Sequence, residues 1–179
     1  MAFLVSFFSK YSDPPLLEAP MPILAMDPLT LGHTAITFVA IATGLMMLGQ
    51  MLGGHLCRLL TAVFLLFTAL TSITGFVFFH PASFTPAQGT GIVSLLILAP
   101  TLYALYGARL AGVWRPVYVV GAVASLYLNV FVLVVQLFLK LPDPPVTGGP
   151  LFGAVQGAVL LGFVAAGWMS LKAFHPAAD

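Results

Sequence analysis

The chain has 179 residues, of which 60% are hydrophobic and only 6% are charged, whereas soluble domains carry about 25% charged residues. This composition cannot cover a surface in contact with water, so it favours an integral membrane protein. The formal net charge of +1 leaves no excess of basic side chains to neutralise phosphates, which argues against nucleic acid as a partner.

Residues 1–28 precede the long apolar stretches and are the hardest part to interpret. The run from Met1 to Phe8 is apolar, but it is too short to span a bilayer and lacks the positive charge that opens a secretory signal. Its aromatic side chains favour an interfacial or poorly ordered segment. The alternative is that translation starts at Met21 or Met26, and in either case no chemistry is predicted here.

Five stretches are long and apolar enough to be transmembrane helices. Such a helix needs about 20 mainly apolar residues, because it pairs its own backbone polar groups inside the hydrocarbon. The stretches are 29–52, 59–79, 89–110, 117–141 and 151–174, and none carries Asp, Glu, Lys or Arg in its central part. Glycine and proline dominate the connections, as expected of segments that break helices. The sequence therefore predicts an all-α bundle over residues 29–174, followed by a tail at 175–179.

The basic residues predict how these helices are oriented. Lys and Arg close to the ends of membrane spans are retained on the cytoplasmic side. In a five-helix arrangement one side carries Arg58, Arg109, Arg115 and Lys172. The other side carries Lys10 and Lys140. This distribution predicts an amino terminus outside the cell and a carboxyl terminus in the cytoplasm.

Small polar residues mark the second and third predicted helices. Thr68, Ser72 and Gly75 share one side of the second helix, and Ser94 and Thr101 belong to a similar row on the third. Both rows indicate seams between helices. Pro100 in the third helix has no N–H to donate to Leu96, so we expect a bend there.

The fourth predicted helix carries nearly all of its strong polar groups on one stripe. At about 100° per residue, the residues that share this side are Tyr118, Ala122, Ser125, Asn129, Val132, Gln136 and Lys140. An amide that faced lipid would have no partner, so the stripe should point into the bundle or toward a wet cavity. Hydrogen bonding between helices and the wall of a passive pore are both compatible with it.

The fifth predicted helix repeats small residues every four positions, namely Ala154, Ala158, Gly162 and Ala166. This spacing lets two helix backbones approach closely, so it predicts a packing face. Besides the lipid bilayer, the partner on this face would be a second copy of the chain or another membrane subunit. Gln156 lies on nearly the opposite side of the helix, where it would address another neighbour such as the stripe on the fourth helix.

Imidazole, amide and amino groups occur toward the predicted outer ends of the helices. The candidate ligand-binding residues are His33, His80, Asn129, Gln136, Lys140 and Gln156. Such groups suit a quinone headgroup or a small polar solute. His33 and His80 would lie on neighbouring antiparallel helices, where two imidazoles can ligate the iron of haem b or another transition metal. The sequence favours an ordinary interfacial or hydrogen-bonding role for both histidines over this one.

Several absences narrow the function further. The predicted spans contain no Asp or Glu for a proton relay or ion coupling, which argues against a pump. No HExxH, GxSxG, P-loop, CxxC or carboxylate-pair motif is present, so no catalytic residue is predicted. The sequence favours a non-enzymatic accessory or assembly subunit, or a small-ligand binder. The alternatives are a haem- or quinone-binding redox protein and a passive pore or solute facilitator.

One group of proteins shares local sequence with this chain. The shared runs are Phe84-Thr85-Pro86-Ala87, Tyr127 to Gln136 with the sequence YLNVFVLVVQ, and Ala154-Val155-Gln156-Gly157. On these runs the chain resembles a group of small bacterial inner-membrane proteins that carry no assigned reaction. The resemblance covers the third to fifth predicted helices and not the first 28 residues. It implies a bacterial inner-membrane location and nothing about activity.

Overall fold

The computed structural model of the chain describes residues 27–77, 86–139 and 149–175. The chain divides into two units, Met1–Leu31 and Gly32–Asp179. The described part of the first unit opens helix α2, where the Asp27 carboxylate accepts a hydrogen bond of 3.2 Å from the backbone N–H of Leu29. The predicted segment 1–28 lies almost wholly outside the described residues.

The described residues form α-helices and one π-helical turn, without a strand. In chain order the elements are α2 (Pro28–Leu52), α3 (Arg58–Val77), α4 (Pro86–Leu102), η1 (Tyr103–Gly107), α5 (Trp114–Leu139) and α6 (Pro150–Ala173). Five helices in the described part of the chain are long and apolar enough to cross a membrane. The predicted all-α bundle is therefore confirmed, with each helix within a few residues of its expected bounds, and the chain is a multi-pass membrane protein.

The third span contains Pro100 and, beyond it, a π-helical turn. Pro100 lies within α4, and this helix passes directly into η1, which begins at Tyr103. At the end of η1 the N–H of Ala108 donates to the carbonyl of Tyr103 at 2.8 Å, five residues back, as the π-helical period requires. The bend expected at Pro100 stays a prediction.

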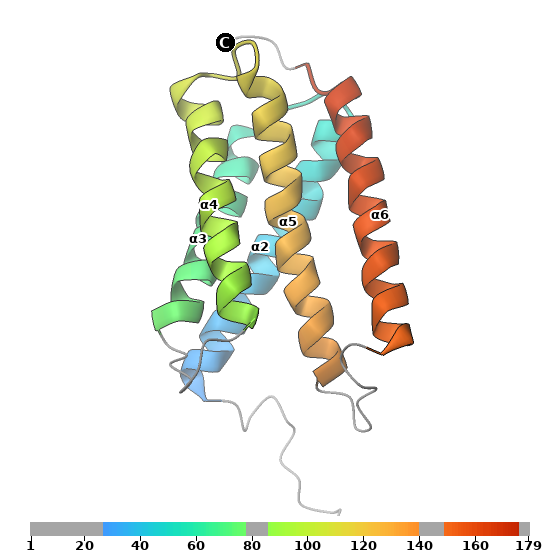
Figure 1. The fold of residues 1–179 in the computed structure, drawn as a ribbon. Coiled ribbons are helices and arrows are strands. Elements are labelled where there is room, and N and C mark those ends of the chain that lie inside the picture. Colours follow the sequence, from blue (N-terminus) through green and yellow to red (C-terminus); the bar gives the residue numbers. More distant parts are fainter. Residues whose placement is uncertain (1–26, 78–85, 140–148, 176–179) are drawn as a thin grey trace, which may run out of the picture. The chain divides into compact units, whose positions relative to one another are not determined.

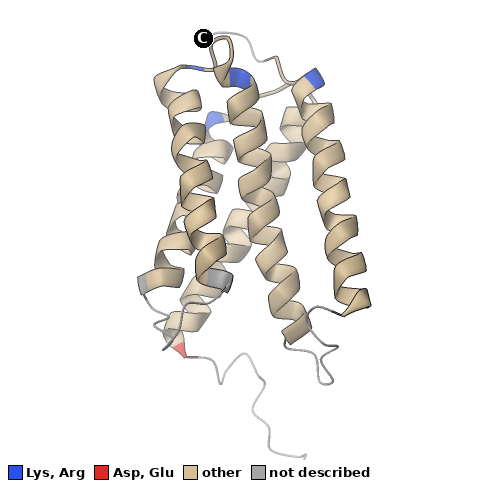
Figure 2. Cartoon of the chain, viewed as in Figure 1, with Lys and Arg blue, Asp and Glu red and all other residues tan. Residues whose placement is uncertain are grey.

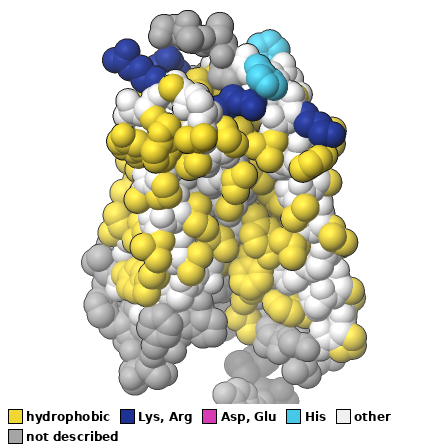
Figure 3. All heavy atoms as spheres, turned by 45° about the horizontal axis from the view of Figure 1, so that its top comes forward, with side chains coloured by type: hydrophobic (Ala, Val, Ile, Leu, Met, Phe, Trp, Pro, Cys, Tyr) yellow, Lys and Arg dark blue, Asp and Glu magenta, His cyan; other side chains and the backbone are white. Residues whose placement is uncertain are grey.

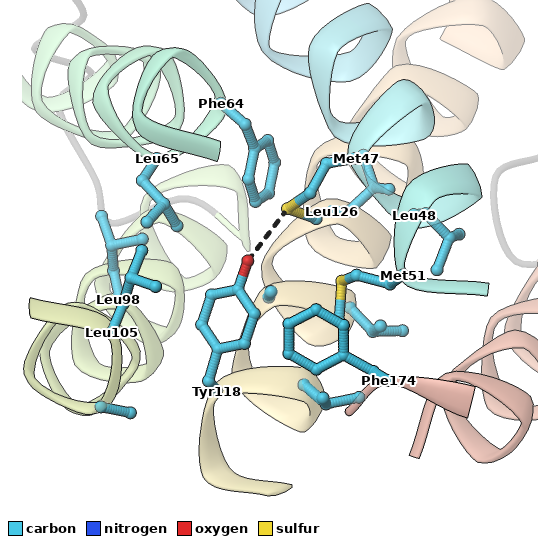
Figure 4. Close-up of a cluster of buried hydrophobic side chains, with 14 residues drawn as sticks. Met47, Leu48, Met51, Phe64, Leu65, Leu98, Leu105, Tyr118, Leu126 and Phe174 are labelled. Atoms are coloured by element: carbon cyan, nitrogen blue, oxygen red, sulfur yellow. Dashed lines mark hydrogen bonds between the residues drawn. The ribbon is translucent and has the colours of Figure 1, made fainter. Parts of the chain in front are cut away.

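Helix α5 is central to the packing of the second unit. It contacts α3, α4 and α6, and α3 also contacts α4 (Figure 1). The buried core draws on all of these helices and on α2 (Figure 4). Tyr118 of α5 lies in its middle, with its hydroxyl 3.8 Å from the sulfur of Met47 and its ring 5.6 Å from that of Phe174. This cluster connects the fourth span to the first span and to the end of the fifth.

Two glycines allow helices to approach α5 closely. A methyl group at Gly121 would collide with the side chain of Thr101 on α4. A methyl group at Gly44 of α2 would similarly collide with Leu126 of α5 and Phe64 of α3. Both glycines are buried, and side chains of the neighbouring helices pack directly against their backbones.

The basic side chains of the second unit gather at one end (Figures 2 and 3). The described Lys and Arg residues there are Arg58, Arg109, Arg115 and Lys172, at the starts of α3 and α5, between α4 and α5, and at the end of α6. The described residues from 32 to 175 include no Asp or Glu. Arg115 also holds α5 to α6, because its guanidinium donates to the carbonyl of Phe174 at 2.6 Å. A cation at the end of a helix suits the partial negative charge of its last carbonyl groups.

Candidate functional site

Threonines on α3 form a row of polar contacts with the two neighbouring helices, which we term the polar seam. Its members are Thr61, Thr68, Thr71 and Thr74 of α3, His33 and Thr37 of α2, and Tyr118 and Asn129 of α5. A period of three or four residues keeps several of these threonines on related sides of α3. The seam therefore lies between helices rather than along a surface that faces lipid.

His33 is anchored to α3 at one end of the seam. Its Nδ1 lies 2.8 Å from Oγ1 of Thr74. The Thr74 hydroxyl also donates to the carbonyl of Leu70 at 2.7 Å, and which atom donates in its contact with Nδ1 depends on the tautomer of the imidazole. The contact orients the imidazole, as an orienting partner does for a ligating histidine.

Asn129 occupies the buried middle of the seam. Its side chain is 6% exposed, and its amide nitrogen donates to Oγ1 of Thr68 at 3.0 Å. The first part of the predicted stripe therefore points into the bundle, since Tyr118, Ala122 and Ser125 are also buried. A hydrogen bond between helices holds α5 to α3 at this depth.

We expect Asn129→Leu to destabilise the bundle through loss of this bond. A double-mutant cycle with Thr68→Val, followed by unfolding in detergent, should give a coupling free energy of about 0.6 kcal/mol and no more than about 1.7 kcal/mol. Gln136→Leu makes the same change at an exposed position of the same stripe and should alter stability by less than about 0.5 kcal/mol. Absence of coupling, or equal losses at Asn129 and Gln136, would contradict this assignment.

Gln136 departs from the expected inward orientation, because its side chain is exposed. The cause is the extent of packing rather than the helical phase. The buried residues of α5 all fall between Tyr118 and Asn129, and its neighbours cover its later turns only in part. Gln136 is three residues from Leu139, where α5 ends, and an amide near a helix end can reach the membrane surface.

Gln156 points toward the fourth span, as its position opposite the small-residue face predicted. The side chain is 8% exposed, and its amide nitrogen donates to the carbonyl of Phe131 at 3.1 Å. The side-chain oxygen is buried without a hydrogen-bond partner. Gln156 therefore contacts the backbone of α5 and not the polar side chains of the stripe.

The six candidate ligand-binding residues have different surroundings. His33, Asn129 and Gln156 bond to three different partners, and Gln136 is exposed. His80 and Lys140 lie outside the described residues. No group of three or more His, Cys, Asp or Glu that could hold a metal occurs in the described part of the chain. A ligand held by these six residues stays a prediction.

Some members of the polar seam and their pairings were not predicted from the sequence. Thr37 lies 3.4 Å from Thr71, and Thr61 lies 3.4 Å from the Tyr118 hydroxyl. The signal was present, because Thr37 follows His33 by one helical turn and Thr71 and Thr74 follow Thr68 at intervals of three. A search for threonines at helical spacing would have extended the row from Thr68 in both directions.

Comparison with known proteins adds no relative: no family model, curated protein or solved structure matches the chain. The resemblance to small bacterial inner-membrane proteins accordingly stays an expectation.

Proposed function

We propose that the chain is a non-enzymatic membrane subunit that assembles with a second copy of itself through α6. The supporting observation is that Ala154, Ala158 and Gly162 are exposed on α6. The residues by which α6 packs inward, Gln156 and Ser170, lie on the other side of the helix. The small-residue face is thus available to a partner.

The physical reason for association is close backbone approach. Hydrophobic burial gives no advantage between helices in lipid, so helix pairs rely on van der Waals packing where side chains are small. Glycine inside a helix costs about 1 kcal/mol relative to alanine. Neighbours within the chain account for Gly44 and Gly121, whereas a methyl group at Gly162 would meet nothing within 4 Å. A second α6 packed here would account for Gly162.

Not every small residue with open surroundings belongs to the proposed contact between two α6 helices. Gly32 and Gly49 of α2 and Gly153 and Gly157 of α6 also have open surroundings, but they do not belong to the row of exposed small residues formed by Ala154, Ala158 and Gly162. Ala166, the last member of the predicted row, is half-buried against the core. The proposed contact is therefore centred on Ala158 and flanked by Ala154 and Gly162.

Mass measurement of the full chain in mild detergent tests the proposal. We expect a dimer or larger assembly, which Ala158→Leu or Gly162→Leu converts to monomer. Ala42→Leu is the matched control, since Ala42 is an exposed alanine on α2. A monomeric unmodified protein, or an assembly that survives both α6 substitutions, would overturn the proposal.

We also propose an inner-membrane location with the carboxyl terminus in the cytoplasm. The support is the cluster of basic residues at the end where α3 and α5 begin, since such residues are retained in the cytoplasm. Cys57 is the single cysteine and lies beside Arg58. An impermeant maleimide should label Cys57 only after the membrane is permeabilised. In a Cys57→Ser background, Leu151→Cys at the opposite end should be labelled in intact cells, and the reverse pattern would invert the orientation.

A second candidate function is binding of haem or a quinone at His33. The observation that favours it is the contact of 2.8 Å between Nδ1 of His33 and Oγ1 of Thr74, which orients the imidazole as the outer partner of a ligating histidine does. The expected sign is an intense visible absorption band in protein purified from haem-supplied cells, lost in His33→Ala. Colourless protein would exclude haem as the ligand. A quinone that failed to protect His33 from chemical modification would be excluded as well.

A further inference from the structure

An apolar groove runs between α5 and α6 and plays no part in the proposed assembly. It has a volume of about 340 Å³ and is lined by residues that include Val120, Ala124 and Tyr127 of α5 and Leu160, Gly167 and Trp168 of α6. The groove lies on a different side of α6 from Ala158 and Gly162. Its existence therefore needs an explanation separate from helix association.

Small residues create the hollow and aromatic residues border it. Gly167 adds no side chain on the α6 side of the groove, and a methyl group there would stand at an ordinary contact distance of 3.4 Å from Val123 of α5. Ala124 contributes only a methyl group on the α5 side. The rings of Tyr127 and Phe163 lie 5.8 Å apart in an edge-on arrangement along the groove. The result is a concave strip rather than a flat contact between two helices.

The groove is as long as one leaflet is deep. Its lining on α6 runs from Leu160 to Leu171, which is roughly 16 Å at a rise of about 1.5 Å per residue. The hydrocarbon core of a bilayer is about 30 Å thick, so one leaflet is about 15 Å deep. A lipid acyl chain that enters from one leaflet has the matching length.

The end of the groove near Leu171 meets the basic end of the bundle. Lys172 directly follows this residue, and its ammonium group lies 4.9 Å from the centre of the Trp168 ring. The guanidinium of Arg115 donates hydrogen bonds to the carbonyls of Leu171 and Phe174. No Asp or Glu occurs among the described residues from 32 to 175, so no carboxylate there offsets this charge (Figure 3). A negatively charged group at the mouth of the groove would be attracted.

From these observations we infer that the groove is a binding site for one anionic phospholipid. An acyl chain lies between α5 and α6 along Ala124 and Gly167. The phosphate is held at the end of α6, where Lys172 and the indole N–H of Trp168 supply a cation and a hydrogen-bond donor. A zwitterionic lipid would fill the same groove but gain less from the basic residues.

Quenching of Trp168 fluorescence by brominated lipid tests this site in the full chain. Trp114→Phe leaves Trp168 as the single tryptophan, since the chain has two. The protein is reconstituted in phosphatidylcholine vesicles that contain brominated phosphatidylglycerol or, as the matched probe, brominated phosphatidylcholine. We expect phosphatidylglycerol to quench at lower mole fraction. Lys172→Gln should reduce this preference about fivefold, the factor for one basic residue at an anionic surface.

Two further variants distinguish lipid binding in the groove from general attraction of anionic lipid to the basic end of the bundle. Ala124→Leu fills the groove and should reduce quenching by brominated phosphatidylglycerol, whereas Ala158→Leu on the far side of α6 should not. Lys172 is exposed, so its replacement tests the headgroup contact without disturbing the core. Equal quenching by the two lipids, a preference that survives Lys172→Gln, or quenching unchanged by Ala124→Leu would each overturn the site.

Discussion

Replacing Tyr118 with alanine should lower the free energy of unfolding by about 3–5 kcal/mol, the range for removal of a large buried aromatic side chain. Tyr118 is fully buried and packs between Met47 of α2 and Phe174 at the end of α6 (Figure 4). Its loss would open a cavity where α2, α5 and the end of α6 meet. Unfolding of the purified chain in detergent, followed by circular dichroism, measures the change.

Tyr118→Phe is the matched control for this substitution. It keeps the ring and removes only the hydroxyl, whose contacts with Thr61 and Met47 are long at 3.4 and 3.8 Å. A hydrogen bond contributes about 0.5–1.5 kcal/mol, and these weak contacts should fall at or below the lower limit. If alanine proved no more disruptive than phenylalanine, the ring would not hold the core as described.

Gly121→Leu should destabilise the bundle by about 1–3 kcal/mol or more, because it forces extra atoms into a closely packed contact. The side chain of Thr101 lies where the new side chain would begin, and its hydroxyl already donates to the carbonyl of Ile97 at 2.7 Å. Thr101 can move only if that bond is lost or if α4 separates from α5. The same unfolding measurement reports the loss.

Gly49→Leu provides the comparison for Gly121→Leu. Gly49 is also helical, but it is exposed, and a methyl group there would meet nothing within 4 Å. Both variants gain the higher helix propensity of leucine over glycine. The difference between their free energies of unfolding therefore measures the packing cost at Gly121. Similar stabilities for the two variants would mean that α4 and α5 do not approach each other at Gly121.

The number and extent of the helices could be predicted from the sequence because the bilayer restricts the options so strongly. A span must be long, apolar and internally hydrogen-bonded, and each of these conditions is visible in composition and length. The bend predicted at Pro100 stays a prediction, and the π-helical turn that begins at Tyr103 was not predicted from the sequence. The apolar bilayer therefore determines the position of these helices more strongly than the helix propensities of their residues do.

Which neighbour covers a given side of a helix could not be predicted in the same way. Helical phase placed Asn129 and Gln136 on one stripe, yet only Asn129 is buried, because burial also depends on the extent of the helices alongside. The spacing of small residues identified a face on α6 but not that this face is exposed. Gly121 and Thr101 meet at a contact between distant positions that no local pattern marks.

The two proposals use different sides of α6 and can fail separately. Self-association depends on the side that carries Ala158, and lipid binding depends on the side that carries Gly167. Ala158→Leu should therefore abolish assembly and leave the lipid preference unchanged. A dimer without lipid preference would exclude the lipid site and support self-association. A lipid-binding monomer would exclude self-association and support the lipid site.

Disulfide cross-linking in intact membranes tests self-association through α6 most directly. In a Cys57→Ser background, Ala158→Cys should give a cross-linked dimer on mild oxidation, because a disulfide forms only where the two Cα atoms come within about 7 Å. Ala42→Cys on the exposed side of α2 should stay monomeric. Absence of a dimer at position 158, or equal cross-linking at both positions, would contradict assembly through α6.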